Sequence, residues 1–344
     1  MYDVMVIGAG PAGCITAKKL ADADYNVLLV ERMKMPREKS CSGILIKKSI
    51  NLIENELGKI PHSVLCKPHI SKGIIITNEK NQTFKFESDG LNVWRSLFDE
   101  WLALKAQSAG AELRQSTSAL SCEEKQDHVS VKLHDSKIYE EKARIVVACD
   151  GAGSIIKRNL FKKPKNYVFT YQTFCKGTID LDHDFFHAFL DPQLSQYDAW
   201  FNVKDDFLIF GVGIQEPATM KMYHSRFLSF LNSKFNVKIE SCVKEEIGIM
   251  PGVMPGCPLD LGTGRILFAG EAANFLNPIG EGISSALASG YGAAEAVKSV
   301  YKTNNFSVKS LINTYKSNIL PEKEYMTRQW TILAGMSSKF SYMK

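Results

Sequence analysis

The first residues of the chain restrict the possible fold more than any other part. An apolar run, Val4 to Ile7, leads directly into Gly8-x-Gly10-x-x-Gly13, and a helix is expected to follow. Glycines permit a tight turn and let backbone N–H groups approach a pyrophosphate, which the N-terminal end of the next helix attracts. The order strand, glycine turn, helix therefore predicts the first unit of a dinucleotide-binding domain.

A second apolar run supports the same interpretation. The segment "NVLLVER" ends in Glu31 and Arg32, and Glu31 follows Gly13 at about the spacing of roughly 20 residues expected for a ribose-binding carboxylate. We predict a set of cofactor-binding residues here: Gly8, Gly10, Ala12, Gly13, Glu31 and Arg32. The alternative, a glycine turn in a sheet that binds no nucleotide, would leave Glu31 as a solvated surface residue.

The length of the chain and its net charge limit the possible classes of function. The chain has 344 residues, 45% of them hydrophobic, so it can bury a sizeable core and about two domains are expected. The 42 Lys and Arg against 37 Asp and Glu give a formal net charge of +5, without any basic tract. This balance does not indicate nucleic acid as a partner.

Neither a membrane span nor a secretion signal is indicated. No apolar run approaches the roughly 18 residues that a membrane span needs, and Met1 to Asp3 lead into a strand without a basic segment. The 8 cysteines are scattered, without a C-x-x-C pair or zinc-like spacing. We therefore expect a cytoplasmic protein with reduced thiols, no disulfide framework and no metal site.

Three separated segments place an apolar strand before an acid or a glycine turn: the N-terminus, 143–154 and 264–290. Between them lie aromatic and β-branched stretches typical of antiparallel strands. We expect an α/β fold with an α+β insert, in which a Rossmann-like cofactor domain spans 1–65, 94–164 and 259–320. A substrate-binding sheet domain spans 66–93 and 165–258, and 321–344 form a C-terminal segment. Helices are expected at 11–21, 95–109 and 281–301.

With these segments in view, residues 1 to about 300 resemble the flavoproteins of the para-hydroxybenzoate hydroxylase superfamily, and within it the geranylgeranyl reductase family. The resemblance implies that the N-terminal motif binds the ADP half of FAD. Asp150 and Gly151 match an internal "DG" motif, and "GEAANFLNPIGEGI" matches the motif around the ribityl chain and flavin ring. From this second motif we predict FAD contacts by Glu271, Gly280, Gly282 and Ile283.

Three features resemble the reductases more than the hydroxylases. "REKSCSGIL" resembles the reductase loop over the flavin and implies contacts by Cys41 and Ser42. "YDAWFNVKDDFLIFGVG" resembles a "YxWxFP…GVG" segment, with Tyr197, Trp200 and Phe201 matching and Asn202 in place of the proline. Arg95 matches the "R-x-x-FD" position near the flavin. The "WxWxIP" motif of the related halogenases is not found.

Several residues have two interpretations each. Cys41 is either a proton donor or a small packing residue in contact with the flavin. Asp150 is either a cofactor contact or a turn-forming residue before Gly151. Tyr197 and Trp200 either line a substrate slot or belong to an ordinary sheet core. The proton that a reduction needs could come from Cys41, from Tyr197 or from water.

The resemblance implies an FAD-dependent oxidoreductase that reduces carbon–carbon double bonds of an isoprenoid by hydride transfer. The alternatives are an FAD-dependent aromatic monooxygenase and a non-catalytic FAD-bound module, and the electron donor is either NAD(P)H or a ferredoxin-like protein. Apolar residues recur at helical spacing near the C-terminus, and this stripe has two interpretations: it packs against the body of the protein, which is favoured, or it makes peripheral contact with a membrane. The residues of the stripe are Met326, Trp330, Leu333, Met336, Phe340 and Met343, beside Arg328, Lys339 and Lys344.

Overall fold

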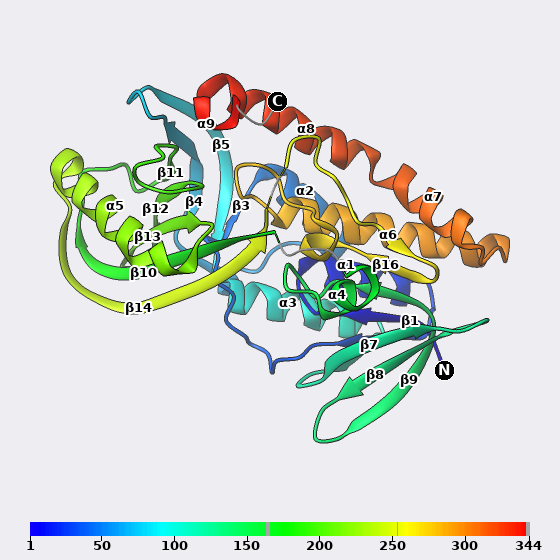
Figure 1. The fold of residues 1–344 in the computed structure, drawn as a ribbon. Coiled ribbons are helices and arrows are strands. Elements are labelled where there is room, and N and C mark those ends of the chain that lie inside the picture. The colour runs from blue at the N-terminus through cyan, green and yellow to red at the C-terminus, as the bar shows by residue number, and fades with distance from the viewer. Residues whose placement is uncertain (163–165, 253, 342–344) are drawn as a thin grey trace.

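The computed structural model describes residues 1–162, 166–252 and 254–341, which form two sheets with helices around them (Figure 1). The first sheet has the order β15-β16-β9-β1-β2-β6, and the hairpin of β7 and β8 extends from β9. Its strands are β1 (Tyr2–Ile7), β2 (Val27–Val30), β6 (Glu112–Arg114), β7 (Ser118–Glu124), β8 (Val129–His134), β9 (Ile138–Ala148), β15 (Gly262–Thr263) and β16 (Ile266–Phe268).

The five strands from β16 to β6 are parallel, as in a Rossmann-like domain. All four residues of β2 are buried, which explains its unbroken apolar sequence. The helices associated with this sheet are α1 (Pro11–Ala21), α3 (Arg95–Ser108), α4 (Ile155–Phe161), α6 (Ile283–Thr303) and α7 (Val308–Asn318). The expected helices at 11–21 and 95–109 are confirmed, and the third begins two residues later than expected, at Ile283.

The second sheet has the order β14-β10-β13-β12-β11-β4-β5-β3 and is antiparallel except where β11 pairs with β4. Its strands are β3 (Ile44–Leu45), β4 (Leu65–Thr77), β5 (Thr83–Val93), β10 (Tyr167–Thr178), β11 (Phe185–Phe189), β12 (Ala199–Lys204), β13 (Phe207–Ile214) and β14 (Lys238–Pro251). One of them, β3, lies in the segment 1–65 that the sequence assigns to the cofactor domain. The fold class predicted from the sequence is therefore confirmed, with this local exception.

The remaining elements pack on the second sheet, on other helices or between the two sheets. These are α2 (Lys47–Leu57), α5 (Met220–Phe235), α8 (Leu320–Met336), α9 (Ser338–Ser341) and the short 3-10 helices His62–Val64, Pro217–Thr219 and Gly270–Ala273. Helix α5 packs on β10 and β13, and its Phe227 and Leu231 share an apolar core with Phe201 and Phe210. In Figure 1 this layer lies on the left, away from the first sheet.

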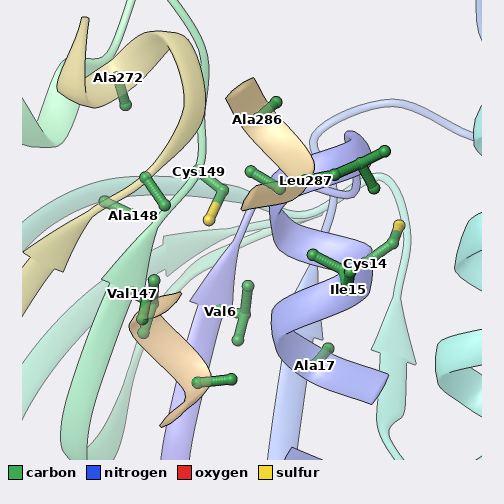
Figure 2. Close-up of a cluster of buried hydrophobic side chains, with 14 of the residues drawn as sticks. Val6, Cys14, Ile15, Ala17, Val147, Ala148, Cys149, Ala272, Ala286 and Leu287 are labelled. Carbon is green, nitrogen blue, oxygen red and sulfur yellow. The ribbon is translucent and has the colours of Figure 1, made fainter. Parts of the chain in front are cut away.

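The main core lies where α1 and α6 cross beside β1 and β9, and small side chains let the two helices approach closely (Figure 2). A Cβ atom on Gly290 would lie 2.2 Å from the carbonyl oxygen of Ala12. Thr16 Oγ1 donates a hydrogen bond to the Gly290 carbonyl oxygen at 2.9 Å. The glycine that ends the late motif is thus required for helix packing, which holds the N-terminal and late motifs together.

The expectation of reduced thiols without a disulfide is wrong for one pair. Cys175 of β10 and Cys242 of β14 form a disulfide. They are 67 residues apart in sequence but are register partners in the antiparallel ladder, so the strand pairing brings their side chains together. Within 1–162, 166–252 and 254–341, no group of His, Cys, Asp or Glu side chains has an arrangement that could hold a metal ion.

The apolar stripe near the C-terminus packs against the body of the protein. Met326, Trp330, Leu333 and Phe340 are buried in the main core, and Met336 packs against it. Met343 lies outside the described residues. The four buried side chains are therefore not available to a bilayer, and core packing, the other interpretation of the stripe, is correct for them. No helix in the described part of the chain is long and apolar enough to cross a membrane.

Candidate active site

A cavity of about 440 Å³ lies between the two sheets, and both contribute to its wall. The first sheet and its loops contribute the glycine turn, the end of β2, the Cys41 loop and the residues around Asp150 and Glu271. The second sheet contributes side chains of β4, β5, β10, β11, β12 and β14. Of the predicted cofactor-binding residues, all but Gly13 line this one cavity: Gly8, Gly10, Ala12, Glu31, Arg32, Cys41, Ser42, Arg95, Asp150, Glu271, Gly280, Gly282 and Ile283.

The glycines of the N-terminal turn have different roles. A Cβ atom on Gly13 would lie 1.8 Å from the carbonyl oxygen of Gly8, so Gly13 is required by the close packing of the turn itself. Around Gly10, by contrast, the nearest protein atom to such a Cβ is the Arg37 guanidinium at 3.7 Å. The surface of Gly10 faces the cavity, at the N-terminus of α1. This open approach to a helix N-terminus fits a pyrophosphate.

Glu31 is held at the end of β2 by backbone hydrogen bonds. It is 4% exposed, and its carboxylate accepts hydrogen bonds from the Ala9 N–H at 2.9 Å and the Met33 N–H at 3.0 Å. Each carboxylate oxygen can accept more than one hydrogen bond, so the group can still take a ribose hydroxyl. Arg32, the next residue, is exposed at the edge of the cavity.

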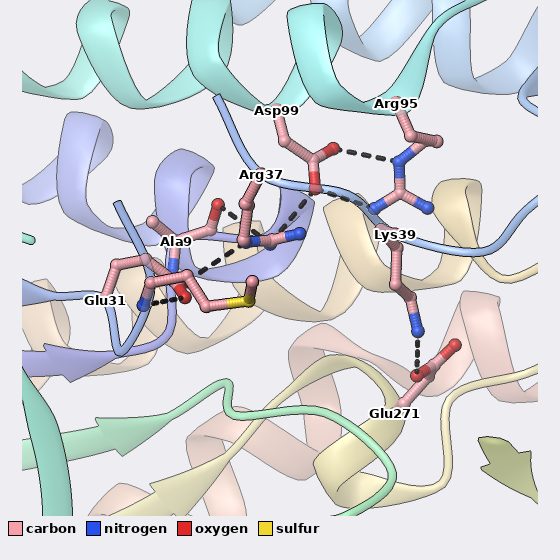
Figure 3. Close-up of polar contacts among 8 residues, drawn as sticks. Ala9, Glu31, Arg37, Lys39, Arg95, Asp99 and Glu271 are labelled. Carbon is pink, nitrogen blue, oxygen red and sulfur yellow. Dashed lines mark hydrogen bonds and ion pairs between the residues drawn. The ribbon is translucent and has the colours of Figure 1, made fainter. Parts of the chain in front are cut away.

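A chain of alternating charges fixes the loop that follows β2 (Figure 3). Arg37 lies 3.4 Å from the Glu31 carboxylate and 3.1 Å from the Asp99 carboxylate of α3. Arg95 donates to both oxygens of Asp99, at 2.9 and 2.8 Å, and it also hydrogen-bonds to the Cys41 thiol. Arg95 is thus buried at the start of α3 and connects this charge network to the Cys41 loop.

The Cys41 loop itself is tightly held. The Gly43 N–H donates to Cys41 Sγ at 3.3 Å, and Lys39 of the same loop lies 3.5 Å from the Glu271 carboxylate. Ser42 is half-buried beside Cys41. The loop therefore bridges the glycine turn and the late motif, where the resemblance predicts the two halves of FAD.

Asp150 carries a carboxylate oxygen suited to a hydroxyl group. Its Oδ2 accepts a hydrogen bond from the Ile155 N–H at 3.0 Å, whereas the buried Oδ1 has no hydrogen-bond partner among the described residues. Burial raises the pKa of Asp150, so an additional hydrogen-bond donor would compensate its desolvation. The ribityl and ribose hydroxyls of FAD are such donors, so the residues present fit the cofactor.

The late motif forms the opposite end of the cavity. Gly280 faces open space, and Ile283 begins α6, with Glu281 accepting the Ser284 N–H at 2.8 Å. A Cβ atom on Gly282 would lie 3.0 Å from a methyl group of Leu276, so its space is limited by the protein rather than by a ligand. Gly280 is therefore better placed than Gly282 to leave room for a cofactor.

The two predicted substrate residues, Trp200 and Tyr197, have different positions relative to the cavity. Trp200 lines the cavity, with its indole over Gly211, where a Cβ atom would lie 2.0 Å from the ring. Tyr197 is buried and is not among the cavity-lining residues, and its neighbour Asp198 lines the cavity instead. The structure therefore gives no support for Tyr197 as a residue in contact with substrate. Phe201 points into the core with α5.

Sequence reasoning missed several residues of the cavity wall: Arg37, Lys39, Thr170, Gln172, Asp198 and Ile249. Arg37 and Lys39 lie in the recognised Cys41 loop, and their positive charge beside a cofactor motif could have identified them as residues of the site. Asp198 lies within the recognised "YDAW" segment, where a carboxylate on a strand face is unusual. Thr170, Gln172 and Ile249 carry no local signal, because only the pairing of β10 with β14 places them here.

Comparison with known proteins identifies the family. The FAD binding domain family matches residues 1–165. The digeranylgeranylglycerophospholipid reductase 2 of Methanopyrus kandleri is 30% identical over 328 residues, which cover 90% of this chain and 80% of that protein. The digeranylgeranylglycerophospholipid reductase of Methanococcus vannielii is 25% identical over 333 residues, covering 94% and 83% of the two chains.

Solved structures show the same fold. A geranylgeranyl bacteriochlorophyll reductase-like protein from Thermoplasma acidophilum has a TM-score of 0.82 at 22% identity, covering 96% of this chain and 86% of that one. The myxobacterial chondrochloren halogenase, an FAD-dependent halogenase, has a TM-score of 0.77 at 17% identity, covering 96% and 82%. The cofactor of this protein is FAD, and the chain belongs to the geranylgeranyl reductase family of FAD-dependent oxidoreductases.

Proposed function

We propose that the protein reduces carbon–carbon double bonds of a hydrophobic prenyl-lipid substrate of the geranylgeranyl type. The names of its relatives, digeranylgeranylglycerophospholipid reductases, support this substrate class. The observation that carries the proposal is the apolar wall that the second sheet presents to the FAD motifs across the cavity. Its members are Ile74, Phe86, Phe186, Trp200, Ile249 and Met250.

An apolar wall suits this chemistry because an isolated double bond offers no hydrogen-bonding group. Recognition must come from shape and burial of apolar surface, which contributes about 25 cal/mol per Å². A second cavity of only about 10 Å³ adjoins the first and is lined mainly by apolar residues of β4, β11, the late motif and the C-terminal helices. Ile74 and Ile279 line both cavities. The second cavity has room for about one water molecule, so an isoprenoid chain would lie in the large cavity.

Reduced FAD, when bound, supplies a hydride at N5 of the flavin. The chain's own residues hold the cofactor, orient the double bond and exclude water. Under this proposal Gly10 and Glu31 bind the ADP half, and Asp150, Glu271, Gly280 and Ile283 lie against the ribityl and ring portion. Cys41, Ser42 and Arg95 position the loop over the ring. Trp200 contributes the substrate side of the cavity.

The test is an anaerobic reaction of the purified flavoprotein. Dithionite reduces the bound FAD directly, so the experiment does not depend on whether NAD(P)H or a ferredoxin-like protein is the natural donor. Addition of a geranylgeranyl lipid is expected to reoxidise the flavin, as seen in its absorbance. The matched lipid with saturated phytanyl chains is the control and should leave the flavin reduced.

The other outcomes identify the rival functions. Reoxidation that requires dioxygen and is accelerated by an aromatic substrate would show a monooxygenase and contradict the proposal. Bound flavin that dithionite and nicotinamide donors fail to reduce would show a non-catalytic FAD-bound module.

A further inference from the structure

We propose that Asp198 is a catalytic residue, the acid that donates the proton to the double bond during the reduction. This inference rests on the proposed function and assigns a step that the sequence left open between Cys41, Tyr197 and water. It follows from the position of Asp198 on the cavity wall and from its neighbours, Lys339 among them.

Strand geometry aims Asp198 at the cavity. Side chains alternate between the two faces of a strand, so Asp198, which immediately precedes β12, shares a face with Trp200. Ala199 and Phe201 point the other way, into the core with α5. The backbone of this segment is fixed to β13, because the Tyr197 N–H donates to the Gly213 carbonyl and the Gly213 N–H donates to the Asp198 carbonyl, both at 2.8 Å.

The side chain of Asp198 also has a defined place. A Cβ atom on Gly213 would lie 3.1 Å from Asp198 Oδ1, so the absence of a side chain there leaves room for the carboxyl group. With the backbone fixed on both sides, the carboxyl group has little freedom to turn away. Asp198 is therefore held at the wall rather than carried on a mobile loop.

Asp198 lies where the two cavities meet. It lines the large cavity together with Trp200 and Ile279, and it lines the small apolar cavity together with Ile279 and Leu333. Ile279 belongs to the late motif, next to Gly280, where the flavin ring is expected. Because Asp198 and Ile279 both line the large cavity, an isoprenoid chain bound there can contact the Asp198 carboxyl group and this loop together. Of the described residues around the small cavity, Asp198 alone has an ionisable side chain.

The local electrostatics suit an acid that works near neutral pH. Burial raises the pKa of Asp198 to about 6, and the positive charge of Lys339 limits the rise. Lys339, on α9, donates to the main-chain carbonyl oxygens of Ser195 and Tyr197. Asp191 and Glu79 act on Lys339 in turn. A carboxyl group poised in this range can both release and regain a proton.

The other candidates are less well placed. Cys41 Sγ already accepts the Gly43 N–H and lies against the Arg95 guanidinium, on the cofactor side of the cavity. Tyr197 is not among the cavity-lining residues. Asp198 adjoins β12 of the second sheet, whereas the residues predicted to hold the flavin ring belong to the Cys41 loop and the late motif. Hydride and proton would thus come from different parts of the cavity wall.

One alkene carbon receives the hydride from reduced FAD, and the other receives the proton of the Asp198 carboxyl group. The O–H bond of Asp198 breaks as the new C–H bond forms, which leaves oxidised FAD, a saturated bond and an Asp198 carboxylate. Lys339 stabilises that carboxylate until water returns a proton.

The experiment compares Asp198→Asn with the wild-type flavoprotein, with Asp206→Asn as the matched control. Asparagine has nearly the shape of aspartic acid but cannot donate this proton. Asp206 is exposed in the turn between β12 and β13, so Asp206→Asn makes the same change of charge at a site away from the cavity.

We expect Asp198→Asn to retain FAD and to be reduced by dithionite, but to be reoxidised by the geranylgeranyl lipid at least about 100-fold more slowly. The wild-type rate should fall above pH about 6, and this dependence should be lost in Asp198→Asn.

The pH dependence of Tm tests the ionisation of Asp198 without requiring catalysis. Ionised Asp198 is penalised by burial, so the wild-type protein loses stability as the pH rises from about 4 to about 6. Asp198→Asn should therefore have a higher Tm than the wild type at pH about 8 and the same Tm at pH about 4. Asp206→Asn should match the wild type at both.

Two results would overturn the inference. One is reoxidation of Asp198→Asn at the wild-type rate with the same pH profile. The other is a lower Tm of Asp198→Asn at pH about 8, which would mean that Asp198 is an ionised partner of Lys339 with a structural role. A wild-type protein that no prenyl lipid reoxidises would instead contradict the proposed function itself.

Discussion

At the scale of residues, the candidate site depends on buried charged side chains that form ion pairs with one another. Glu31, Arg37, Asp99 and Arg95 alternate in sign and connect the end of β2, the Cys41 loop and α3. Asp99 is fully buried, and two guanidinium groups depend on it. Removal of one member of such a network is costly because it leaves the others buried without compensation.

Asp99→Asn is expected to lower the free energy of unfolding by about 3 kcal/mol, since the amide cannot neutralise Arg95 and Arg37. Urea denaturation of the FAD-bound protein measures this change. Asp22→Asn is the control, because its ion pair with Lys18 is at the surface and should contribute less than about 1 kcal/mol. Equal effects of the two substitutions would show that the network does not stabilise the fold.

The two glycines of the N-terminal turn should respond differently to substitution. A Cβ atom on Gly10 meets no protein atom closer than 3.7 Å, and the valine side chain of Gly10→Val would extend into the space proposed for the pyrophosphate, so we expect a folded protein that has lost its FAD. Gly13→Ala would clash with the Gly8 backbone and should reduce the yield of folded protein. Flavin absorbance and circular dichroism separate the two effects. A Gly10→Val protein with a full complement of FAD would contradict this placement of the cofactor.

At the scale of elements, the pair of strands β12 and β13 shapes the substrate side of the cavity. Gly211 and Gly213 face the same side as Trp200 and Asp198 and leave space for their side chains. The "GVG" sequence therefore has a packing explanation: its glycines accommodate one large ring and one carboxyl group. Val212, between them, points into the core with α5.

Gly211→Ala is expected to displace the Trp200 indole, because the new methyl group would lie within 2.0 Å of the ring. Overpacking of this kind typically costs 1–3 kcal/mol, and we expect about 2 kcal/mol together with a shift in tryptophan fluorescence. In a Trp200→Leu background, the same Gly211→Ala change should cost about 1 kcal/mol less. Additive effects in this double-mutant cycle would show that the two residues do not compete for one space.

The sequence predicts those elements that depend on a pattern of neighbouring residues. The helix 11–21 follows from its glycine turn and Pro11. The helix α3 is found where the spacing of Leu97, Trp101 and Leu104 predicts it, but Leu97 and Leu104 are exposed, and its buried apolar face is formed by Phe98, Leu102, Ala103 and Ala106 instead. The choice between Tyr197 and Asp198 was beyond this reasoning, because side chains alternate and a shift of one residue reverses the face. Only the pairing of Tyr197 and Asp198 with Gly213 determines which of them faces the cavity.

At the scale of the whole molecule, contacts between distant segments determine two features that the sequence alone did not settle: the disulfide and the environment of the apolar stripe. The Cys175–Cys242 disulfide depends on the ladder between β10 and β14. The apolar stripe of α8 suggested either a bilayer or a core, and periodicity alone cannot distinguish these. Glu322 of α8 is buried, accepts a hydrogen bond from Ser285 at 2.6 Å and pairs with Lys48. These contacts fasten α8 to α6 and α2.

Trp330→Ala should therefore act on stability. Trp330 is buried and packs edge-on against Phe340, so its truncation is expected to cost about 3 kcal/mol. Ile332→Ala is the control, since Ile332 is 45% exposed on the same helix and should change stability by less than about 0.5 kcal/mol. Thermal denaturation measures both. A Trp330→Ala protein as stable as the wild type would show that α8 does not pack as described.

We propose that this flavoprotein transfers hydrogen, and not oxygen, to a prenyl lipid. The most direct measurement is the mass of the lipid product after an anaerobic single turnover with dithionite-reduced FAD. We predict a product heavier by two hydrogen atoms for each double bond reduced. A lipid of unchanged mass, or a product that forms only in air and is heavier by one oxygen atom, would contradict it.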